Sequence, residues 1–437
     1  MPVPIVAVVG RPNVGKSTFV NRIAQSQDAI VHEQAGVTRD RSYHRAEWNG
    51  VDFMLVDTGG IEMATADAFG SSIRGQALAA AEEADAVVFI VDGQTGVQAD
   101  DEEVARLLKR SKTPVFLVVN KMDNPAKEEA IHEFWALGLG DPRPVSSVHG
   151  HGTGDVLDDL VAALPLIGED EAADEIRVAI IGRPNAGKSS LLNKLAGAER
   201  SIVSEVAGTT RDSIDTVVEL GETTYRLIDT AGLRRQSKID ESVEYYSFVR
   251  ALRSIDRADV ALLVVDASLG VTDQDQRVAR FAEERGCALV VLLNKWDALE
   301  DDLAKEAVED DLPRKLHFVD YAPVLRISAL TGRGVAKILG AVDAVYEAFS
   351  SEIPTSALNK LLTEMREFGH TVSKGKRTLR VNYVTQTGTK PPIFTFFCNH
   401  PSLADDNFRR YTENRLRGAF ELTGTPIRLR FRSKGEK

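Results

Sequence analysis

The feature that most constrains this chain is a long internal repeat. The segment GRPNVGKSTFVNRIA at 10–24 returns as GRPNAGKSSLLNKLA at 182–196, and 9 of the 15 positions are identical. Three shorter motifs follow in the same order in each half, and their copies lie 172 or 174 residues apart. Solenoid repeats are only roughly 20–50 residues long. The spacing therefore predicts two whole domains of one kind within the 437 residues.

Short apolar runs indicate how each of these domains folds. In the first copy the runs are IVAVV, FMLV, AVVFIV and VFLVV, and helical stretches separate them. Continuous apolarity is typical of strands buried on both faces, as in a parallel sheet covered by helices. Each motif begins where such a run stops, and ligands of open α/β sheets bind at the carboxyl ends of the strands. The predicted fold class is α/β, with two tandem phosphate-loop domains whose sheets are mostly parallel.

The repeat spacing and a change in composition place the domain boundaries. The segment PLIGEDEAADEI at 165–176 carries five acidic residues and no basic one, which predicts a solvated linker. An alternative is an acidic strip that docks on the basic C-terminal end. We predict a first domain at 1–165, the linker at 166–175, a second domain at 176–350 and a C-terminal domain at 351–437.

The C-terminal domain has a different pattern and the opposite charge. Its predicted elements form a small α+β domain: a helix at 356–368, strands at 379–385 and 393–398, a helix at 405–422 and a strand at 427–432. Residues 353–437 hold 16 Lys and Arg against 7 Asp and Glu, although the whole chain has a net charge of −12. This asymmetry predicts an anionic partner at this end.

Two groups of basic residues in that domain are candidates for RNA contact. The first group is a basic run, for which the alternative interpretation is a solvated edge of the domain. The second group alternates along the last predicted strand, so that its three cations lie on one face. Their mutual repulsion there favours a phosphate or acidic partner. The groups are Lys374, Lys376, Arg377 and Arg380, and then Arg428, Arg430 and Arg432.

The cysteines and the hydropathy of the chain indicate in which cellular compartment we expect the protein. Cys287 and Cys398 lie in apolar runs and are too few for a disulfide framework, so we expect two buried, reduced thiols in a cytoplasmic protein. No apolar stretch reaches the roughly 18 residues of a membrane span, and the first residues do not resemble a signal peptide. We expect a monomer with no membrane partner.

Each copy of the repeat begins with a loop suited to phosphate. The pattern GxxxxGKS lies between a predicted strand and a predicted helix, so its glycines let several N–H groups point at a β-phosphate. Lys16 and Lys188 are predicted to neutralise phosphate oxygens, and Ser17 and Ser189 to ligate Mg²⁺. The nucleotide-binding set of these loops is Gly10, Asn13, Gly15, Lys16, Ser17 and Thr18, and then Gly182, Asn185, Gly187, Lys188, Ser189 and Ser190.

The next two motifs complete the phosphate site. Thr38 and Thr210 lie in polar segments that can close over Mg²⁺ and the γ-phosphate and release when that phosphate is lost; Thr209 is an alternative to Thr210. In the DTGG and DTAG motifs, Asp57 and Asp229 are predicted to hold Mg²⁺ through water. Gly60 and Gly232 are predicted to offer a backbone N–H to the γ-phosphate. The catalytic set is Lys16, Thr38, Gly60, Lys188, Thr210 and Gly232.

The NKMD and NKWD motifs select the base. Guanine presents its N1–H and N2–H₂ donors side by side, and one carboxylate accepts both, an arrangement that adenine cannot match. Asp123 and Asp297 take this role, so the sequence predicts GTP and GDP as ligands. Asn120 and Asn294 are expected to brace the loop and contact the base, with Lys121 and Lys295 over its face. Backbone support for guanine is expected from Ser146, Ser147, Ser328 and Ala329.

Taken together, these motifs resemble one family closely, the bacterial double-GTPase family Der, also called EngA. The resemblance rests on the doubled GRPNxGKS, DTxG and NKxD motifs and covers essentially the whole chain. It implies two GTPase domains followed by a KH-like domain, hydrolysis of GTP to GDP and phosphate, and assembly of the large (50S) ribosomal subunit, with that subunit and its rRNA as partners.

The C-terminal domain departs from the usual KH pattern, because no GxxG lies between its predicted helices. This departure argues against ordinary KH-style capture of single-stranded RNA. We expect contact with structured rRNA, or packing against the GTPase domains, instead.

The resemblance also bears on hydrolysis. The residue after DTGG or DTAG, often a water-orienting Gln in small signalling GTPases, is Ile61 or Leu233, and an apolar side chain cannot polarise water. Asn13 and Asn185 mark related GTPases that bind K⁺ near the β- and γ-phosphates. We expect K⁺ to take the place of an arginine finger, a role worth roughly 10³–10⁵ in rate in other GTPases. The alternative is that each Asn only braces its loop.

Other classes of function fit less well. A GTPase-coupled tRNA-modification or other RNA-processing factor is an alternative, although the C-terminal domain shows no second catalytic constellation. A membrane-remodelling GTPase would need an amphipathic or spanning segment. An ATP-dependent kinase or motor conflicts with the two NKxD motifs.

Overall fold

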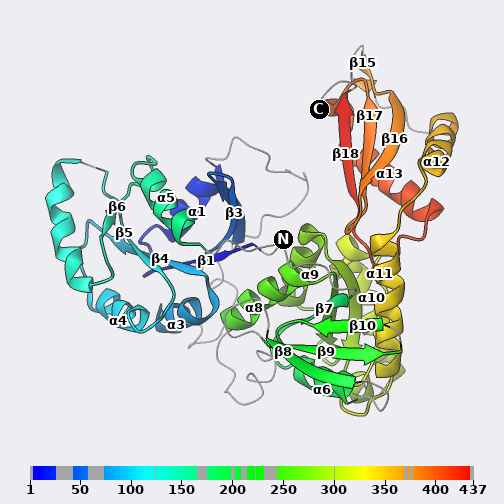
Figure 1. Cartoon of the computed structure of the whole chain (residues 1–437), viewed down its shortest axis with the longest axis horizontal. Coiled ribbons are helices and arrows are strands. Elements are labelled where there is room, and N and C mark those ends of the chain that lie inside the picture. The colour runs from blue at the N-terminus through cyan, green and yellow to red at the C-terminus, as the bar shows by residue number, and fades with distance from the viewer. Residues whose placement is uncertain are drawn as a thin grey trace. The chain divides into compact units, whose positions relative to one another are not determined.

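A computed structural model (Figure 1) describes residues 3–25, 43–57, 73–123, 125–164, 175–197, 202–207, 214–221, 223–230, 244–299, 301–368, 373–374 and 377–433. The chain divides into two compact units. The first comprises Met1–Asp170 with Asp240–Arg253, and the second Glu171–Ile239 with Ser254–Lys437. The second copy of the repeat and the C-terminal domain therefore share one unit. The predicted domain boundaries stay a prediction, and the acidic linker lies, apart from Glu175, outside the described residues.

The first unit is built on a six-stranded sheet in the order β2-β3-β1-β4-β5-β6. All neighbours pair in parallel except β2, which runs antiparallel to β3. The strands are β1 (Ile5–Val9), β2 (Tyr43–Trp48), β3 (Val51–Asp57), β4 (Ala86–Asp92), β5 (Val115–Asn120) and β6 (Arg143–Pro144).

Helices cover both faces of this sheet. Side chains of α1 (Lys16–Gln25) and α5 (Thr153–Ala163) pack on the face that carries Val6, Val8 and Val88. Helix α3 (Ile73–Glu83) contacts β1, β4 and α4 (Ala99–Leu108). A 3-10 segment, η1 (Pro125–Leu137), lies beside α4. Every residue of β1 and β4 is buried, as continuous apolar runs predict for strands covered on both faces.

The second unit begins with a seven-stranded sheet in the order β13-β12-β11-β7-β10-β9-β8. Its strands are β7 (Glu175–Ile181), β8 (Ile202–Ala207), β9 (Ile214–Leu220), β10 (Thr223–Leu227), β11 (Val260–Asp266), β12 (Ala288–Asn294) and β13 (Val324–Arg326). Strands β8, β9 and β10 pair antiparallel and the others in parallel. Its helices are α6 (Lys188–Ala196), α9 (Asp273–Arg285), α10 (Asp302–Lys315) and α11 (Ile338–Ser350). Helix α8 (Glu244–Arg257) begins in the first unit and ends in the second. The predicted fold class is thus confirmed for both copies.

The C-terminal domain is a three-stranded sheet with helices on one side (Figure 1). Its elements are α12 (Thr355–Phe368), β14 (Ser373–Lys374), β15 (Arg377–Thr378), β16 (Val381–Gly388), β17 (Ile393–Cys398), α13 (Asp406–Ala419) and β18 (Arg428–Ser433). The predicted order of helices and strands holds, with a short β14–β15 hairpin added. Some predicted bounds were wrong. Strand β16 runs from Val381 to Gly388 rather than from 379 to 385, and α13 ends at Ala419 because Phe420 is already extended. The other bounds agree to within one residue.

This domain packs against the second copy of the repeat. The backbone N–H of Leu289 donates to the carbonyl of Gly424 (2.7 Å), and the N–H of Gly424 donates to the carbonyl of Tyr321 (2.8 Å). Arg428 forms an ion pair with Glu283 (2.8 Å) and also donates to the carbonyls of Glu283 and Glu284 at the end of α9. The expected packing on a GTPase domain is therefore found in the second copy.

Two further expectations concern burial and the membrane. Cys287 and Cys398 are buried free thiols, as predicted. In the described part of the chain, no helix combines the length and the apolarity that crossing a bilayer requires.

Candidate functional site

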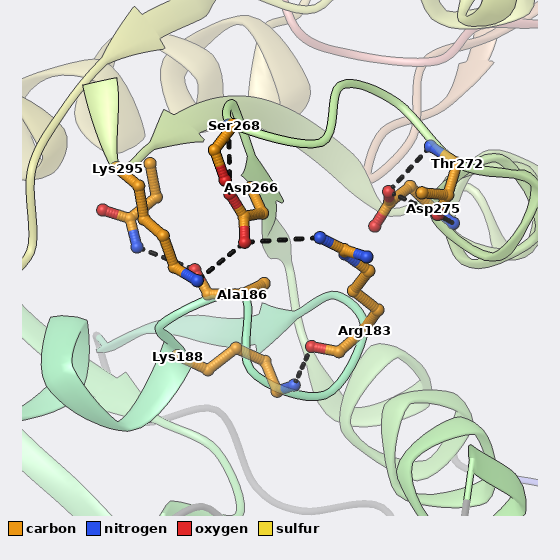
Figure 2. Close-up of polar contacts among 9 residues, drawn as sticks. Arg183, Ala186, Lys188, Asp266, Ser268, Thr272, Asp275 and Lys295 are labelled. Atoms are coloured by element: carbon orange, nitrogen blue, oxygen red, sulfur yellow. Dashed lines mark hydrogen bonds and ion pairs between the residues drawn. The ribbon is translucent and has the colours of Figure 1, made fainter. Parts of the chain in front are cut away.

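The phosphate loops of both copies adopt the same backbone and hold their lysines in the same way. Lys16 is buried at the start of α1, and its Nζ donates to the carbonyl oxygens of Gly10 (2.6 Å) and Arg11 (3.0 Å). In the second copy, the Nζ of Lys188 donates to the corresponding carbonyls of Gly182 (2.8 Å) and Arg183 (2.7 Å), as Figure 2 shows in part. Each ammonium therefore lies inside the curl of its own loop, where phosphate oxygens can accept its hydrogen bonds.

The glycines of these loops are required by close contacts with the neighbouring strands. A Cβ on Gly10 would strike the backbone carbonyl of Ile90 on β4. Gly15 has a φ of +97°, and a Cβ there would strike the side-chain amide of Asn120. Gly182 and Gly187 meet the equivalent atoms of Val264 and Asn294. Any side chain would push the loop away from the strand ends.

The two NKxD asparagines connect the phosphate loop of each copy to the segments that follow its last two strands. The Nδ2 of Asn120 donates to the carbonyl of Val14 (2.8 Å), and its Oδ1 accepts from the N–H (3.0 Å) and hydroxyl (2.8 Å) of Ser147. In the second copy Asn294 donates to Ala186 (2.7 Å) and accepts from the N–H of Ala329 (2.8 Å). The predicted bracing role is confirmed at both positions.

The carboxylate of Asp123 in the NKMD motif is also held in place. The hydroxyl of Ser146 donates to Oδ1 of Asp123 (2.5 Å), and Ser146 itself is fully buried. Ser328, the matching residue of the second copy, is also buried, and Asp297 is exposed. These side chains lie at the end of the sheet to which the phosphate loops also belong, since Asn120 and Asn294 are the last residues of β5 and β12.

Sequence reasoning missed an aspartate that holds the NKxD lysine. Nζ of Lys121 lies 2.6 Å from Oδ2 of Asp92, and Nζ of Lys295 lies 2.7 Å from Oδ2 of Asp266 (Figure 2). Burial raises the pKa of Asp92, but the hydrogen bond and charge of Lys121, together with backbone hydrogen bonds from Gln94 and Thr95, outweigh it and leave this pKa below its ordinary value. The pKa of Asp266 is lowered by Lys295 and Ser268 against the same opposing effect of burial. Both carboxylates therefore remain charged and hold the side chains of the two lysines, whose backbones are left-handed (φ of 65° and 61°).

A second contact that sequence reasoning missed joins each phosphate loop to a helix further along the chain, α4 in the first copy and α9 in the second. Arg11 Nε donates to Oδ1 of Asp101 (2.9 Å), a fully buried residue in the first turn of α4. In the second copy the guanidinium of Arg183 reaches Asp266 (3.3 Å), while its backbone bonds to Asp275, which caps α9 with Thr272. The repeat itself carries the signal for these residues, because Arg11 and Arg183 are 172 apart and the aspartates are 174 apart in the sequence.

The predicted magnesium ligands are only partly described. Ser17 and Thr18 lie exposed in the first turn of α1, and Ser189 and Ser190 hold the same places in α6. Asp57 is buried as the last residue of β3, whereas Asp229 lies in a turn after β10 with a φ of 53°. The remaining predicted residues lie outside the described part of the chain: Thr38, Gly60, Ile61, Thr209, Thr210, Gly232 and Leu233.

The two copies differ in what holds the first residue of the DTGG or DTAG motif. Oδ1 of Asp215, on β9, accepts from the backbone N–H of Asp229 (2.9 Å), and Arg257 pairs with Oδ2 (2.5 Å). The adjacent hydroxyls of Thr216 and Thr230 are 2.8 Å apart. The first copy has Tyr43 at the corresponding position, so it cannot form this carboxylate pair. The DTAG motif of the second copy is therefore anchored by a contact that the first copy lacks.

Comparison with known protein families matches all three domains. Residues 5–121 and 177–295 each match the model described as "50S ribosome-binding GTPase". Residues 352–432 match the model "KH-domain-like of EngA bacterial GTPase enzymes, C-terminal". The matches span the two phosphate loops, both NKxD asparagines and the C-terminal sheet described above.

Characterised relatives match along the whole chain. "GTPase Der" of Moorella thermoacetica is 48% identical over 438 residues and covers 100% of both chains. "GTPase Der" of a Nostoc species is 49% identical over 437 residues, which cover 99% of this chain and 96% of the relative. Among solved structures, the G-domain of FeoB from Methanococcus jannaschii is 26% identical, covers 37% of this chain and 98% of that one, and has a TM-score of 0.28.

Proposed function

Because the chain belongs to the family of Der GTPases, we propose that it is a nucleotide-dependent assembly factor of the large (50S) ribosomal subunit. The observation that supports this proposal is the doubled site, in which a phosphate loop and a guanine-reading motif are joined by one buried asparagine. The match to a family described as ribosome-binding and the basic C-terminal domain indicate rRNA of that subunit as the partner. The same proposal places a monomeric protein in the cytoplasm, where ribosomes assemble.

The residues fit a guanine nucleotide with Mg²⁺. We propose that the carboxylates of Asp123 and Asp297 accept from the base, and that the curled loops present their N–H groups and lysines to the phosphates. The exposed hydroxyl of Ser17 and the buried strand-end carboxylate of Asp57 are the oxygen donors that Mg²⁺ prefers. A bound Mg²⁺ would neutralise charge on the β- and γ-phosphate oxygens. Thr38, Gly60, Thr210 and Gly232 are proposed to complete the two sites.

We also propose that K⁺ stimulates hydrolysis through Asn13 and Asn185. Both residues lie in the phosphate loop with left-handed backbones (φ of 65° and 61°), and their side chains are exposed beside the place where the loop would hold a nucleotide. The test compares GTP hydrolysis in K⁺ and Na⁺ for the unchanged chain and for Asn13→Ala and Asn185→Ala. Loss of the K⁺ stimulation in a variant supports the proposal, and equal rates in K⁺ and Na⁺ for the unchanged chain refute it.

The ribosomal role is tested by cosedimentation with purified ribosomal subunits in K⁺ buffer. We expect binding to the large subunit with a non-hydrolysable GTP analogue, and weaker binding with GDP or without nucleotide. GTP hydrolysis without binding in any of the three conditions would leave a double GTPase but remove the ribosome from its function.

A further inference from the structure

The open face of the C-terminal sheet carries a row of aromatic and basic side chains. Strand pairing aligns Tyr383 on β16 with Phe397 on β17, and Phe397 with Arg432 on β18. The next row consists of Thr385, Thr395 and Arg430. Since side chains alternate along a strand, both rows lie on one face and the intervening residues on the other.

The opposite face of the same sheet forms the core of the domain. Phe394 and Phe396 are buried there against Leu358, Leu362 and the other apolar residues of α12 and α13. Figure 1 shows both helices on this one side of the three strands. The row of Tyr383, Phe397 and Arg432 is therefore on the face that the helices of this domain leave uncovered.

Tyr383 and the two arginines of these rows are available to a ligand, whereas Phe397 is half-buried and Thr395 is buried. The ring centroids of Tyr383 and Phe397 lie 6.0 Å apart, and Tyr383 is 44% exposed although tyrosine is a large, partly apolar residue. Arg430 and Arg432 are exposed, and within the described residues neither forms an ion pair. The third arginine of the strand, Arg428, is different, because Glu283 of the second GTPase domain already holds it.

This combination matches the chemistry of unpaired nucleotides better than that of duplex RNA. Aromatic rings on an open sheet stack on bases, and each stacked base contributes roughly 1–3 kcal/mol in proteins that bind single strands. Guanidinium groups beside the rings pair with phosphates. In a duplex the bases are already stacked on each other, so their faces are not available. The basic balance of residues 353–437, 16 Lys and Arg against 7 Asp and Glu, complements the same ligand.

We propose that the open face of β16, β17 and β18 binds single-stranded RNA by stacking unpaired bases on Tyr383 and Phe397, while Arg430 and Arg432 pair with the flanking phosphates. This site is a sheet face and not the loop between two helices that a GxxG motif would form. It deepens the proposed ribosomal function, because it names the part of an rRNA that the C-terminal domain recognises: an unpaired segment.

The test is fluorescence anisotropy of a labelled, unstructured ten-nucleotide oligouridine with the full-length chain. We expect Tyr383→Ala to weaken binding by about tenfold or more and Tyr383→Phe, which keeps the ring, to bind as the unchanged chain does. Arg432→Gln should reduce the slope of log affinity against log salt by about one. Its matched control is Arg410→Gln, which removes the same charge from the exposed side of α13 and should have a smaller effect.

Several outcomes would overturn this inference. They are no binding of the oligouridine by the unchanged chain, equal competition by duplex RNA, or equal losses with Arg410→Gln and Arg432→Gln. Cosedimentation of the same variants with ribosomal subunits separates this inference from the proposed function. Subunit binding that is unchanged in Tyr383→Ala and Arg432→Gln sinks the stacking face alone, and oligouridine binding without subunit binding sinks the ribosomal role alone.

Discussion

Asn120 shows at the scale of one residue how each site is assembled. Its amide group donates to the phosphate loop at Val14 and accepts from Ser147, so a single side chain sets the distance between base and phosphate contacts. Both of its partners are buried, and an unsatisfied buried polar group is costly. The residue therefore has a structural role in joining these two segments of the chain.

We predict that Asn120→Ala lowers the free energy of unfolding of the first domain by about 1–3 kcal/mol, because the Val14 carbonyl and the Ser147 N–H lose their partner. The same change should weaken GDP binding at the first site only. Thermal unfolding and GDP titration check both effects, and Asn294→Ala is the matched control for the second site. Equal weakening at both sites in one variant would count against this explanation.

We predict that the contribution of Lys188 to the stability of the folded chain depends on pH. Burial lowers the pKa of Lys188 from 10.5 to about 8, so the folded chain releases this proton at lower pH than the unfolded chain does. Between those two values the unfolded chain binds more protons, so the contribution of Lys188 to stability rises with pH in that window.

A phosphate favours the charged ammonium, so nucleotide binding near pH 8.5 should take up a proton at the second site, and binding near pH 6.5 should take up almost none. Calorimetry in buffers of different ionisation enthalpy measures this uptake, and Lys188→Ala should abolish it. Proton uptake that is the same at both pH values would show that Lys188 is already charged before nucleotide binds.

At the scale of elements, the helix after β4 is tied to the phosphate loop. Asp101 lies in the first turn of α4, accepts from the backbone N–H of Gln98 (3.1 Å) and also holds Arg11. It therefore caps the helix and fixes the loop with one carboxylate. The equivalent Asp275 caps α9 in the second copy.

We predict that Asp101→Ala destabilises the first domain by about 1–3 kcal/mol, since a buried cap and a largely buried ion pair are lost together. It should also raise the dissociation constant for GDP. Asp100→Ala is the control, because Asp100 is exposed in the same helical turn. Denaturant unfolding measures the free energy of unfolding of both variants. Equal destabilisation would mean that only the negative charge near the helix N-terminus is important.

The sequence was sufficient to predict the helices and strands but not the long-range contacts between them. Short-range patterns placed Lys16 at a helix start and Asn120 at a strand end, because apolar runs and glycine spacing are local properties. The partners of Arg11 and Arg428 are 90 and 145 residues away, and no local pattern identifies them. The start of β16 was misplaced for a related reason: Leu379 is buried by tertiary contacts and was counted as strand, whereas the ladder begins at Val381.

At the scale of the molecule, the three domains form two compact units. The C-terminal domain and the second GTPase domain share backbone hydrogen bonds at Gly424, the ion pair of Arg428 with Glu283, and the Arg417 guanidinium over the Tyr321 ring at 4.1 Å. Because α9 begins beside the phosphate loop at Asp275 and ends at the contacts of Arg428, it connects the second nucleotide site to the C-terminal domain.

We predict that the second GTPase domain and the C-terminal domain unfold in one transition. Arg428→Ala should lower that transition or split it, with a loss of about 1–3 kcal/mol, because the carbonyls at the end of α9 and Glu283 lose their cation. Differential scanning calorimetry of the nucleotide-free chain measures this. Arg430→Ala, two residues along the same strand and exposed, should leave the transition unchanged, so a similar shift in both variants would argue against a specific contact.

The central claim is that one chain carries two independent guanine-nucleotide sites, and that each site recognises the base through its own carboxylate. Xanthine has a carbonyl where guanine has its N2 amine, so an amide in place of the carboxylate should favour xanthine nucleotides. The most direct measurement is the binding stoichiometry of labelled GDP and of xanthosine diphosphate for the unchanged chain, Asp123→Asn and Asp297→Asn. We predict two GDP per unchanged chain, and one GDP with one xanthosine diphosphate for each variant. A single GDP per unchanged chain, or loss of both GDP sites in one variant, would contradict the account.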